Sequence, residues 1–450
     1  MVTQPARGSL DVMASPSVSS EDIEAAWARS DAVFDLVATR ALLERPIALR
    51  QPFLFYVGHL PAFAWNQLWR GRLGRPAFAP ELDALFERGI DPVDTADYRP
   101  SEAERWPSLD DTLRYRDCVR RELRGVMDVL VASEGPIVAT VLEHELMHHE
   151  TLLYMVQQLA HEDQRPPVAG PTAGPAGPAA PRRVRIPAGT VTLGAPREGS
   201  GFGWDNEFPE SHVSVEAFEI DATPVRNSEF LEFVDAGGYR NRRLWDEESW
   251  DWLGRQGRCH PLSWRRDGER WLVGALFADV PFESAADWPA CVSACEADAF
   301  ALWRGQRLPT EAEFQRAAHV TPDGSLRAHP WGSDAPAPVH GRFGWRHWSP
   351  APVGSHPAGS SAWGVLDLVG NGWEWTSTPF APFPGFEPMP HYAGYSRDFF
   401  DGRHVVALGA SWATDDRLVR RTFRNWYQRH YPYVFSKFRC VASEARIDPA

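Results

Sequence analysis

The stretch PIVATVLEHELMHHETLLYMVQQLA (residues 136–160) carries HELMHHE (144–150) inside an otherwise apolar helical pattern. Three histidines and two glutamates in seven positions are too many polar groups for a helix that only packs, because buried polar groups need partners. His144 and His148 are spaced i, i+4, so they lie on one face of a helix, about one turn apart. This spacing lets two imidazoles bind one metal ion. The stretch therefore predicts a helix that belongs to a bundle and carries part of a metal site.

Three more segments ahead of residue 164 have apolar residues at helical spacing, and they cover residues 19–43, 50–74 and 112–135. The first opens with Ser-Ser-Glu-Asp, an N-terminal cap followed by acidic residues. With residues 136–160, these segments predict an up-and-down four-helix bundle, in which side chains on facing helices supply metal ligands.

The second half of the chain has a different pattern. Residues 183–195 and 212–225 are short, β-rich and bounded by glycine or proline, and only a few pieces, such as 227–238 and 291–305, look helical. The twenty tryptophans fall mostly after residue 240. We expect an α+β multidomain protein whose second domain has little regular structure.

These patterns divide the chain into four parts. Residues 1–22 read as a disordered lead, 23–163 as the helical bundle, and 184–450 as the mixed domain. Between the two domains, residues 164–183 are rich in proline, glycine and alanine, which predicts a linker.

Composition excludes several classes of protein. A net charge of −14 argues against a nucleic-acid partner, because phosphate binding needs a basic surface. No apolar run approaches the roughly 18–20 residues that span a bilayer, and the N-terminus lacks an apolar signal core, so we expect a cytoplasmic protein with no membrane partner. Five scattered cysteines indicate reduced thiols, and the spacing of Cys291 and Cys295 fits two buried residues on a helix.

A third metal ligand has to come from another helix, and His59 in FLFYVGHLPAFAW (53–65) is the best candidate. Taken singly, such a histidine is more often a satisfied core residue; beside the His144–His148 pair it becomes the expected third ligand. Three neutral imidazoles leave coordination positions open, as in catalytic metal sites, and their geometry allows zinc, iron or other metals. Glu150 either supports a ligand or is solvated.

The His-x3-His-x-Glu pattern of residues 144–150 resembles the DinB-like bundle of ergothioneine sulfoxide synthases. The second half resembles the formylglycine-generating-enzyme fold, a sulfatase-modifying-factor domain that is C-type-lectin-like. The matching stretches are IPAGTVTLGA (186–195), FGWDNEFPESHV (202–213), RLPTEAEFQRAA (307–318), GNGWEWTSTPF (370–380), GASWAT (409–414) and FRNWYQRHYPYVFSKFRC (423–440).

This resemblance implies a non-heme Fe(II) held by His59, His144 and His148. It also implies O2 as co-substrate, hercynine (N-trimethylhistidine) as substrate, and a sulfur or selenium donor that becomes bonded to C2 of the imidazole. Because its cysteines do not form a recognisable active pair, the second domain is expected to cover the bundle's metal and hold the substrates.

The resemblance also implies substrate-binding and catalytic residues in the second domain. Trp426 matches a substrate-contacting tryptophan, and an aromatic face suits a trimethylammonium group, which cannot donate hydrogen bonds. Asn425 beside it can bind a carboxylate. Tyr392 and Tyr395 are the candidate proton donors, and Tyr392 matches the catalytic position best. Without the resemblance, core packing would be the preferred interpretation of all four residues.

Two positions depart from the family pattern, and both lie where substrates are held. Met147 stands where sulfoxide synthases commonly have glutamine, and Tyr427 stands where enzymes that use γ-glutamylcysteine have aspartate. These departures favour the selenoneine synthase branch, whose donor is a selenosugar. γ-Glutamylcysteine or cysteine as donor, a zinc-dependent thiol transferase, and a non-catalytic metal-binding protein remain the alternatives.

Overall fold

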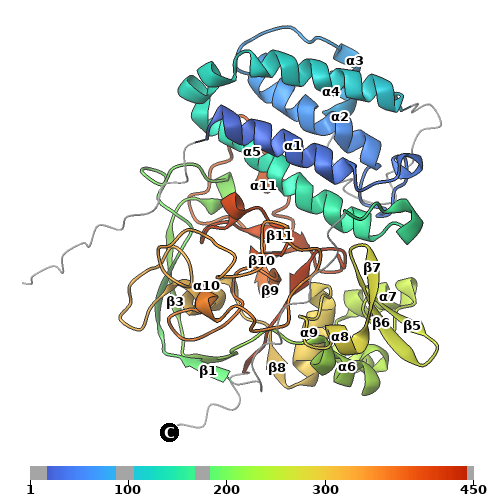
Figure 1. The fold of residues 1–450 in the computed structure, drawn as a ribbon. Coiled ribbons are helices and arrows are strands. Elements are labelled where there is room, and N and C mark those ends of the chain that lie inside the picture. Colours follow the sequence, from blue (N-terminus) through green and yellow to red (C-terminus); the bar gives the residue numbers. More distant parts are fainter. Residues whose placement is uncertain (1–17, 88–105, 168–182, 443–450) are drawn as a thin grey trace, which may run out of the picture.

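A computed structural model describes residues 18–87, 106–167 and 183–442, and it shows a layer of helices packed on a β-rich domain (Figure 1). Most of the expected lead and linker therefore lies outside the described residues. The helical layer contains α1 (Ser20–Phe34), α2 (Phe53–Ala64) with a π-helical extension (Trp65–Arg70), α3 (Pro80–Phe86), α4 (Leu109–Arg124) and α5 (Met127–Gln157).

The four long helices of the expected bundle are present, and local sequence explains where they begin and end. The Ser19 hydroxyl caps α1 by accepting a 3.2 Å hydrogen bond from the Asp22 amide. The single helix expected over residues 112–135 is wrong, because α4 ends at Arg124 and α5 begins at Met127. Helix α5 consists of two helical runs that join at a kink, within two residues of the expected boundary between residues 135 and 136. It bends at Glu134 (φ −132°, ψ 31°), just ahead of Pro136, which removes one backbone donor and crowds the preceding turn without ending the helix.

Within the described ranges, no single helix is long and apolar enough to cross a membrane. Helices α4 and α5 are long and apolar enough only when taken together, and the chain bends by 95° between them.

The C-terminal domain combines short strands with short helices, as expected. Four strands form the sheet β11-β10-β9-β12 that lies beneath α5 (Figure 1), and a second four-stranded sheet has the order β1-β4-β13-β8. The pair β2-β3 and the meander β5-β6-β7 complete the strands found in the described residues. The strands are β1 (Arg183–Ile186), β2 (Gly189–Leu193), β3 (Ser211–Val215), β4 (Phe218–Asp221), β5 (Trp264–Asp267), β6 (Arg270–Ala275), β7 (Ala278–Pro281), β8 (Gln306–Arg307), β9 (Gly372–Pro379), β10 (His404–Ala410), β11 (Asn425–Gln428), β12 (Ser436–Lys437) and β13 (Val441–Ala442), and the helices are α6 (Asn227–Asp235), α7 (Glu247–Gln256), α8 (Phe282–Ala285), α9 (Ala294–Trp303), α10 (Glu311–His319) and α11 (Gly394–Arg397).

All five cysteines are free thiols, as the sequence indicated. Cys295 is buried on α9, but Cys291 precedes the Ser293 cap of that helix. The expectation that both lie on one helix is therefore wrong, because the chain turns into the helix only after Cys291.

One continuous hydrophobic cluster contains residues of both the helical layer and the C-terminal domain. Polar contacts cross the same boundary. The Glu143 carboxylate of α5 accepts hydrogen bonds of 2.8 Å from the Trp204 indole and 2.8 and 2.9 Å from the Arg420 guanidinium. The face of α5 that carries the histidine motif is thereby held against the C-terminal domain.

Candidate metal centre and substrate cavity

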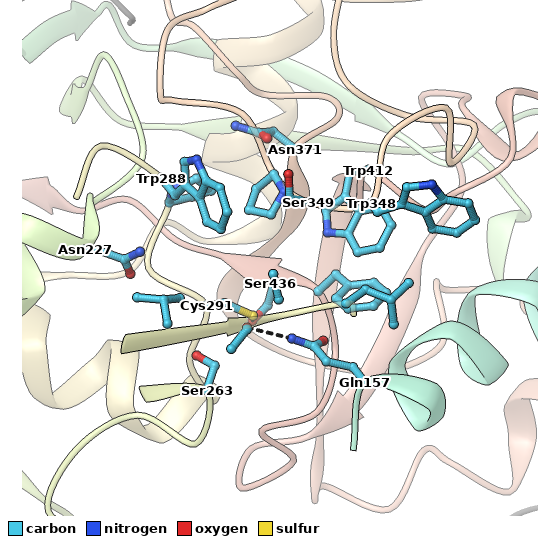
Figure 2. A pocket seen from close by; sticks show the side chains of 17 residues that line it. Gln157, Asn227, Ser263, Trp288, Cys291, Trp348, Ser349, Asn371, Trp412 and Ser436 are labelled. Carbon is cyan, nitrogen blue, oxygen red and sulfur yellow. Dashed lines mark hydrogen bonds between the residues drawn. The ribbon is translucent and has the colours of Figure 1, made fainter. Parts of the chain in front are cut away.

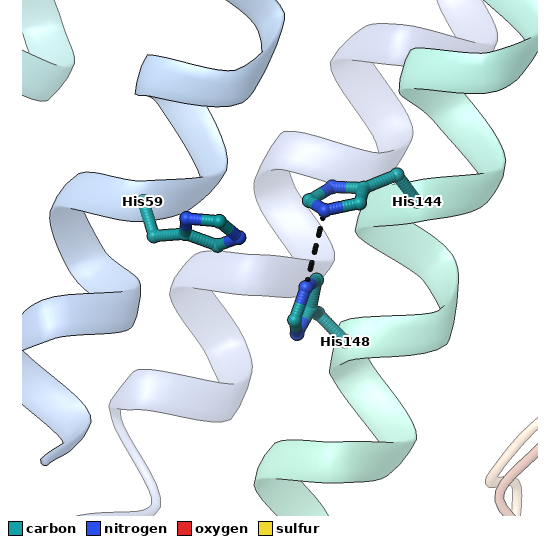
Figure 3. A group of neighbouring side chains, drawn as sticks. All are labelled: His59, His144 and His148. Atoms are coloured by element: carbon teal, nitrogen blue, oxygen red, sulfur yellow. Dashed lines mark hydrogen bonds between the residues drawn. The ribbon is translucent and has the colours of Figure 1, made fainter. Parts of the chain in front are cut away.

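The three histidines singled out in the sequence come together in the structure. His59 on α2 faces His144 and His148 on α5 (Figure 3), and one ligand atom from each lies within 4.8 Å of the other two. Their exposed fractions are only 5%, 5% and 4%. Two helices from different parts of the chain thus place three metal-binding side chains around one point.

A hydrogen bond to the backbone orients the ring of His59. His59 Nδ1 lies 2.7 Å from the carbonyl oxygen of Phe86, so this nitrogen carries the proton and Nε2 keeps its lone pair. His59 Nε2 and His148 Nδ1 are both buried without a hydrogen-bond partner. His148 Nε2, the other nitrogen of that ring, lies 3.2 Å from His144 Nε2. Buried nitrogen atoms rarely lack a partner, and a metal ion bound at the cluster would explain the partnerless His59 Nε2.

Burial keeps the cluster uncharged. It lowers the pKa of His59 to about 4 and lowers the pKa values of His144 and His148 well below the usual range. Neighbouring imidazoles in the cluster add to the effect on His144 and His148. All three rings are therefore neutral at pH 7, which is the form that binds metals.

The other polar groups of residues 143–150 have separate partners. Glu145 and His149 point to α1, where the Ser30 hydroxyl donates to Glu145 over 2.6 Å and lies 2.7 Å from His149 Nε2. Glu143 and Glu150 are spaced i, i+7, so both face the C-terminal domain. The polar stretch thus has three functions around one helix: metal binding, contact with α1 and contact with the second domain.

Glu150 is buried, with 5% of its surface exposed, so the solvated alternative is wrong. Its carboxylate accepts hydrogen bonds from the Trp373 indole (2.8 Å) and from the hydroxyls of Ser411 (2.6 Å) and Thr414 (2.7 Å). Burial raises its pKa, and these three donors oppose that rise. Glu150 therefore joins the metal-bearing helix to the C-terminal domain, and its hydrogen bonds do not go to a ligand histidine.

A cavity of about 420 Å³ lies between the bundle and the C-terminal domain. His144 and His148 lie on its wall, so two of the clustered histidines border the space where a substrate fits. The other residues singled out in the sequence line the same cavity: Met147, Glu150, Tyr392, Tyr395, Asn425, Trp426 and Tyr427.

The two candidate proton donors differ in their surroundings. The Tyr392 ring lies 6.4 Å from the His144 ring, and its hydroxyl has no hydrogen-bond partner among the described residues. The Tyr395 ring stacks on Trp204 at 3.9 Å, and its hydroxyl donates to the sulfur of Met147 over 3.4 Å. Burial raises the pKa of Tyr392 to about 12 and that of Tyr395 well above 10, so both phenols are protonated at pH 7.

Strand β11 presents three consecutive cavity residues. Trp426 stacks on Phe380, with ring centroids 4.2 Å apart and planes 6° apart, which covers one face of the indole. The rings of Tyr395 and Phe399 also contact it, with centroids 5.2 and 5.6 Å away. The Asn425 amide donates a 3.0 Å hydrogen bond to the Tyr427 hydroxyl. This hydrogen bond connects Asn425, which is expected to bind hercynine, with Tyr427, which is expected near the chalcogen donor.

Sequence patterns did not reveal Arg50, Tyr154 and Tyr431, which also line the cavity. Tyr154 extends the spacing His144, Met147, Thr151 along α5, and this i+3/i+4 series was the available signal. Arg50 and Tyr431 gave no such signal, because their neighbours come from distant segments.

A second cavity, of about 40 Å³, lies beside Cys291, Asn227 and Gln157 (Figure 2). Gln157 crosses it to donate a 2.9 Å hydrogen bond to the carbonyl of Gly274. Burial raises the pKa of Cys291, so its thiol stays protonated at neutral pH. This cavity is too small for a molecule the size of hercynine, since pockets that bind small molecules usually hold about 300 Å³ or more.

Comparisons with known proteins agree with this architecture. Residues 171–444 match the family of the sulfatase-modifying factor enzyme 1-like domain. The chain is 34% identical to hercynine oxygenase of Mycobacterium tuberculosis over 402 residues, covering 87% of this chain and 91% of that protein. It is 31% identical to ergothioneine biosynthesis protein 1 of Neurospora crassa, covering 94% of this chain but only 57% of that longer protein. Formylglycine-generating enzyme of Mycobacterium tuberculosis is 31% identical over 46% of this chain and 76% of its own length.

The fold and the site define a class of enzyme in which a helical bundle with a buried histidine cluster is covered by a sulfatase-modifying-factor domain, with a substrate-sized cavity between them. Within this class, the chain belongs to the ergothioneine sulfoxide synthase family, the family of the hercynine oxygenases. The family resemblance read from the sequence is thus confirmed.

Proposed function

We propose that this chain is an O2-dependent, non-heme Fe(II) synthase that bonds selenium or sulfur to C2 of the imidazole of hercynine. The observation that carries this proposal is the position of the histidine cluster. Two of its three buried rings border a cavity of about 420 Å³, which is also lined by all the C-terminal residues expected to bind substrate. The names of the hercynine oxygenase relatives support the same substrate.

The residues fit the proposed metal. Three neutral nitrogen ligands leave open positions for substrate and O2, and the buried Nε2 of His59 lacks any other partner. Fe(II) would supply O2 activation and a site where the hercynine imidazole and the chalcogen meet. Phe63 stacks on His144 at 3.6 Å and helps to fix that ring for this role.

The cavity residues would perform three tasks. The open face of Trp426 would hold the trimethylammonium of hercynine by a cation–π contact. The Asn425 amide, which has two N–H donors, would keep one for the hercynine carboxylate. The Tyr392 hydroxyl, which is protonated and close to His144, would donate a proton beside the reacting atoms.

A selenosugar is the donor we favour. The cavity wall in the described residues carries two arginines and three acidic side chains: Arg50, Arg403, Glu150, Asp398 and Asp401. γ-Glutamylcysteine brings two carboxylates, and a wall with more acids than cations does not favour it. Met147 and Tyr427 offer an apolar and an aromatic surface where an amide and a carboxylate would serve a peptide, which also favours the sugar.

One experiment tests the function and the donor together. The protein is loaded with Fe(II) under anaerobic conditions, exposed to O2 with hercynine and an equimolar mixture of a selenosugar, γ-glutamylcysteine and cysteine, and the products are identified by mass spectrometry. We expect a hercynine–selenium product. If the product is a hercynyl-cysteine sulfoxide without selenium, the protein is an ergothioneine sulfoxide synthase and not a selenoneine synthase. No product with any donor, together with zinc in the protein as purified, would support a thiol transferase.

A further inference from the structure

One end of the substrate cavity is built around a buried arginine. Arg50 precedes α2, has 6% of its surface exposed and lines the cavity. Its guanidinium donates hydrogen bonds of 3.1 and 2.8 Å to the Tyr154 hydroxyl and lies 5.2 Å from the centre of the Tyr431 ring. These contacts fix a permanent cation on the cavity wall.

Tyrosines surround this cation. The rings of Tyr427 and Tyr431 are parallel within 2°, with centroids 5.8 Å apart, and the Tyr431 ring meets that of Tyr154 edge-on at 6.2 Å. Burial raises the pKa values of Tyr427 and Tyr431 well above 10. Their phenols are therefore neutral, and each can donate and accept a hydrogen bond.

This group lies beside the metal centre on the same face of α5. His148, Thr151 and Tyr154 follow one another at i+3 spacing, and all three line the cavity. Tyr154 is six residues beyond His148, or about 9 Å along the helix at 1.5 Å per residue. A small molecule that places its chalcogen near the histidine cluster could therefore reach the arginine with its other end.

Most residues expected to hold hercynine lie elsewhere on the wall, and Asn425 connects the two groups through its hydrogen bond to the Tyr427 hydroxyl. Tyr395 contacts Trp426 and Met147, and Tyr392 contacts His144. The contacts of Arg50 that are described above involve Tyr154 and Tyr431 instead. The cavity thus has two chemically different ends, one aromatic and one with a guanidinium among phenols.

We propose that Arg50, Tyr154, Tyr427 and Tyr431 form the subsite for the chalcogen donor, and that they bind an uncharged, hydroxyl-bearing group of sugar type. This inference rests on the proposed function and adds the residues that recognise the second substrate. A guanidinium and neutral phenols match the hydroxyls of a sugar, and the tyrosine rings offer apolar surface to its C–H groups. An arginine also binds carboxylates, but Arg50 is the one cation among these four residues, whereas γ-glutamylcysteine brings two carboxylates.

Equilibrium binding separates this inference from turnover. The full-length Fe(II) protein is kept anaerobic with saturating hercynine, and 1-thio-β-D-glucose, cysteine and γ-glutamylcysteine are titrated by calorimetry. We expect wild type to bind the thiosugar most tightly. Arg50→Met should weaken thiosugar binding at least about tenfold, and Tyr431→Phe by about threefold, while hercynine affinity changes by less than about twofold.

Arg266→Met is the matched control, because Arg266 also lies over an aromatic ring, that of Trp271, and does not line the cavity. It should leave the thiosugar affinity unchanged. Thermal melting tests whether Arg50→Met is folded, and Arg50→Lys and Tyr431→Phe, which make smaller changes, provide the test if it is not.

Thiosugar affinity that is the same in wild type, Arg50→Lys and Tyr431→Phe would overturn the subsite. Tighter binding of cysteine or γ-glutamylcysteine, lost in the Arg50 variants, would overturn the sugar class. Neither result depends on product formation, so a failure of the proposed function itself would appear separately, as the absence of turnover in wild type with every donor.

Discussion

The indole nitrogen of Trp373 on strand β9 donates a 2.8 Å hydrogen bond to the Glu150 carboxylate on helix α5. Glu150 lies two residues beyond His148, so this bond links the sheet of one domain to the metal-bearing helix of the other. The hydroxyls of Ser411 and Thr414 complete the contact. Because the helix cannot rotate without breaking three hydrogen bonds, this contact helps to keep His144 and His148 turned toward the cavity.

Replacing Glu150 should therefore destabilise the protein. Glu150→Ala leaves three donors without an acceptor in a buried position, and we expect a loss of about 3 kcal/mol or more in the free energy of unfolding. Glu150→Gln should lose less, because its carbonyl still accepts. Denaturant titration of the metal-free protein measures the effect, with the exposed Glu122→Ala as control. A Glu150→Ala variant as stable as the control would contradict the role of this contact.

Alanine at His59, His144 or His148 should abolish retention of Fe(II) while the protein stays folded, because each change removes one of the three clustered nitrogen ligands. Metal content after anaerobic gel filtration is the measurement. His149→Gln is the matched control: His149 is also buried, but its ring contacts Ser30 on α1. Full iron retention in His59→Ala would show that His59 is not an iron ligand.

Tyr392→Phe should slow product formation by about 100-fold or more, the scale of a lost general acid, and leave hercynine binding nearly intact. The change removes only a hydroxyl that has no hydrogen-bond partner in the described part of the chain. Tyr395→Phe should have the smaller effect on turnover, because its hydroxyl is engaged with Met147. Single-turnover rates and hercynine titrations of both variants decide the question. A larger loss in Tyr395→Phe would exchange the two roles.

Glu145 should make stability depend on pH. Burial raises its pKa to about 7 from 4.5. Between these values the folded protein binds more protons than the unfolded chain, so the contribution of Glu145 is present below about pH 4.5 and is lost as the pH rises through 7. The stability of wild type relative to Glu145→Gln should fall by about 3 kcal/mol across this window, at 1.36 kcal/mol per pKa unit. A difference that does not vary with pH would show that Glu145 is ionised throughout.

Tyr427→Asp should shift donor preference toward γ-glutamylcysteine. It places a carboxylate where the donor's ammonium can bind, and it removes one of the stacked rings beside Arg50. In competition between the two donors, the sulfur product should gain at least about tenfold over the selenium product, as judged by mass spectrometry. Tyr427→Phe, which keeps the ring and adds no charge, should change the preference by no more than about threefold, the effect expected for Tyr431→Phe. If Tyr427→Asp leaves the donor preference unchanged, the donor does not bind beside residue 427.

The sequence alone determined the class of each domain and the existence of the metal-binding pair. Helical spacing of apolar residues predicted the four long helices, and the i, i+4 spacing of His144 and His148 placed both rings on one face, because these are local properties of a helix. Several separate motifs, in the order found in the family, were sufficient to identify the family. The turn between the end of α4 at Arg124 and the start of α5 at Met127 was missed, whereas the boundary expected between residues 135 and 136 falls near the kink at Glu134.

Only the tertiary structure decided how the polar groups divide their partners. Glu143 and Glu150 face the second domain and Glu145 faces α1, although all three look alike in the sequence. Arg50 meets Tyr154 and Tyr431 across segments far apart in the chain. Contacts between distant segments depend on how whole helices and strands pack, and the spacing of residues along the chain does not specify that packing.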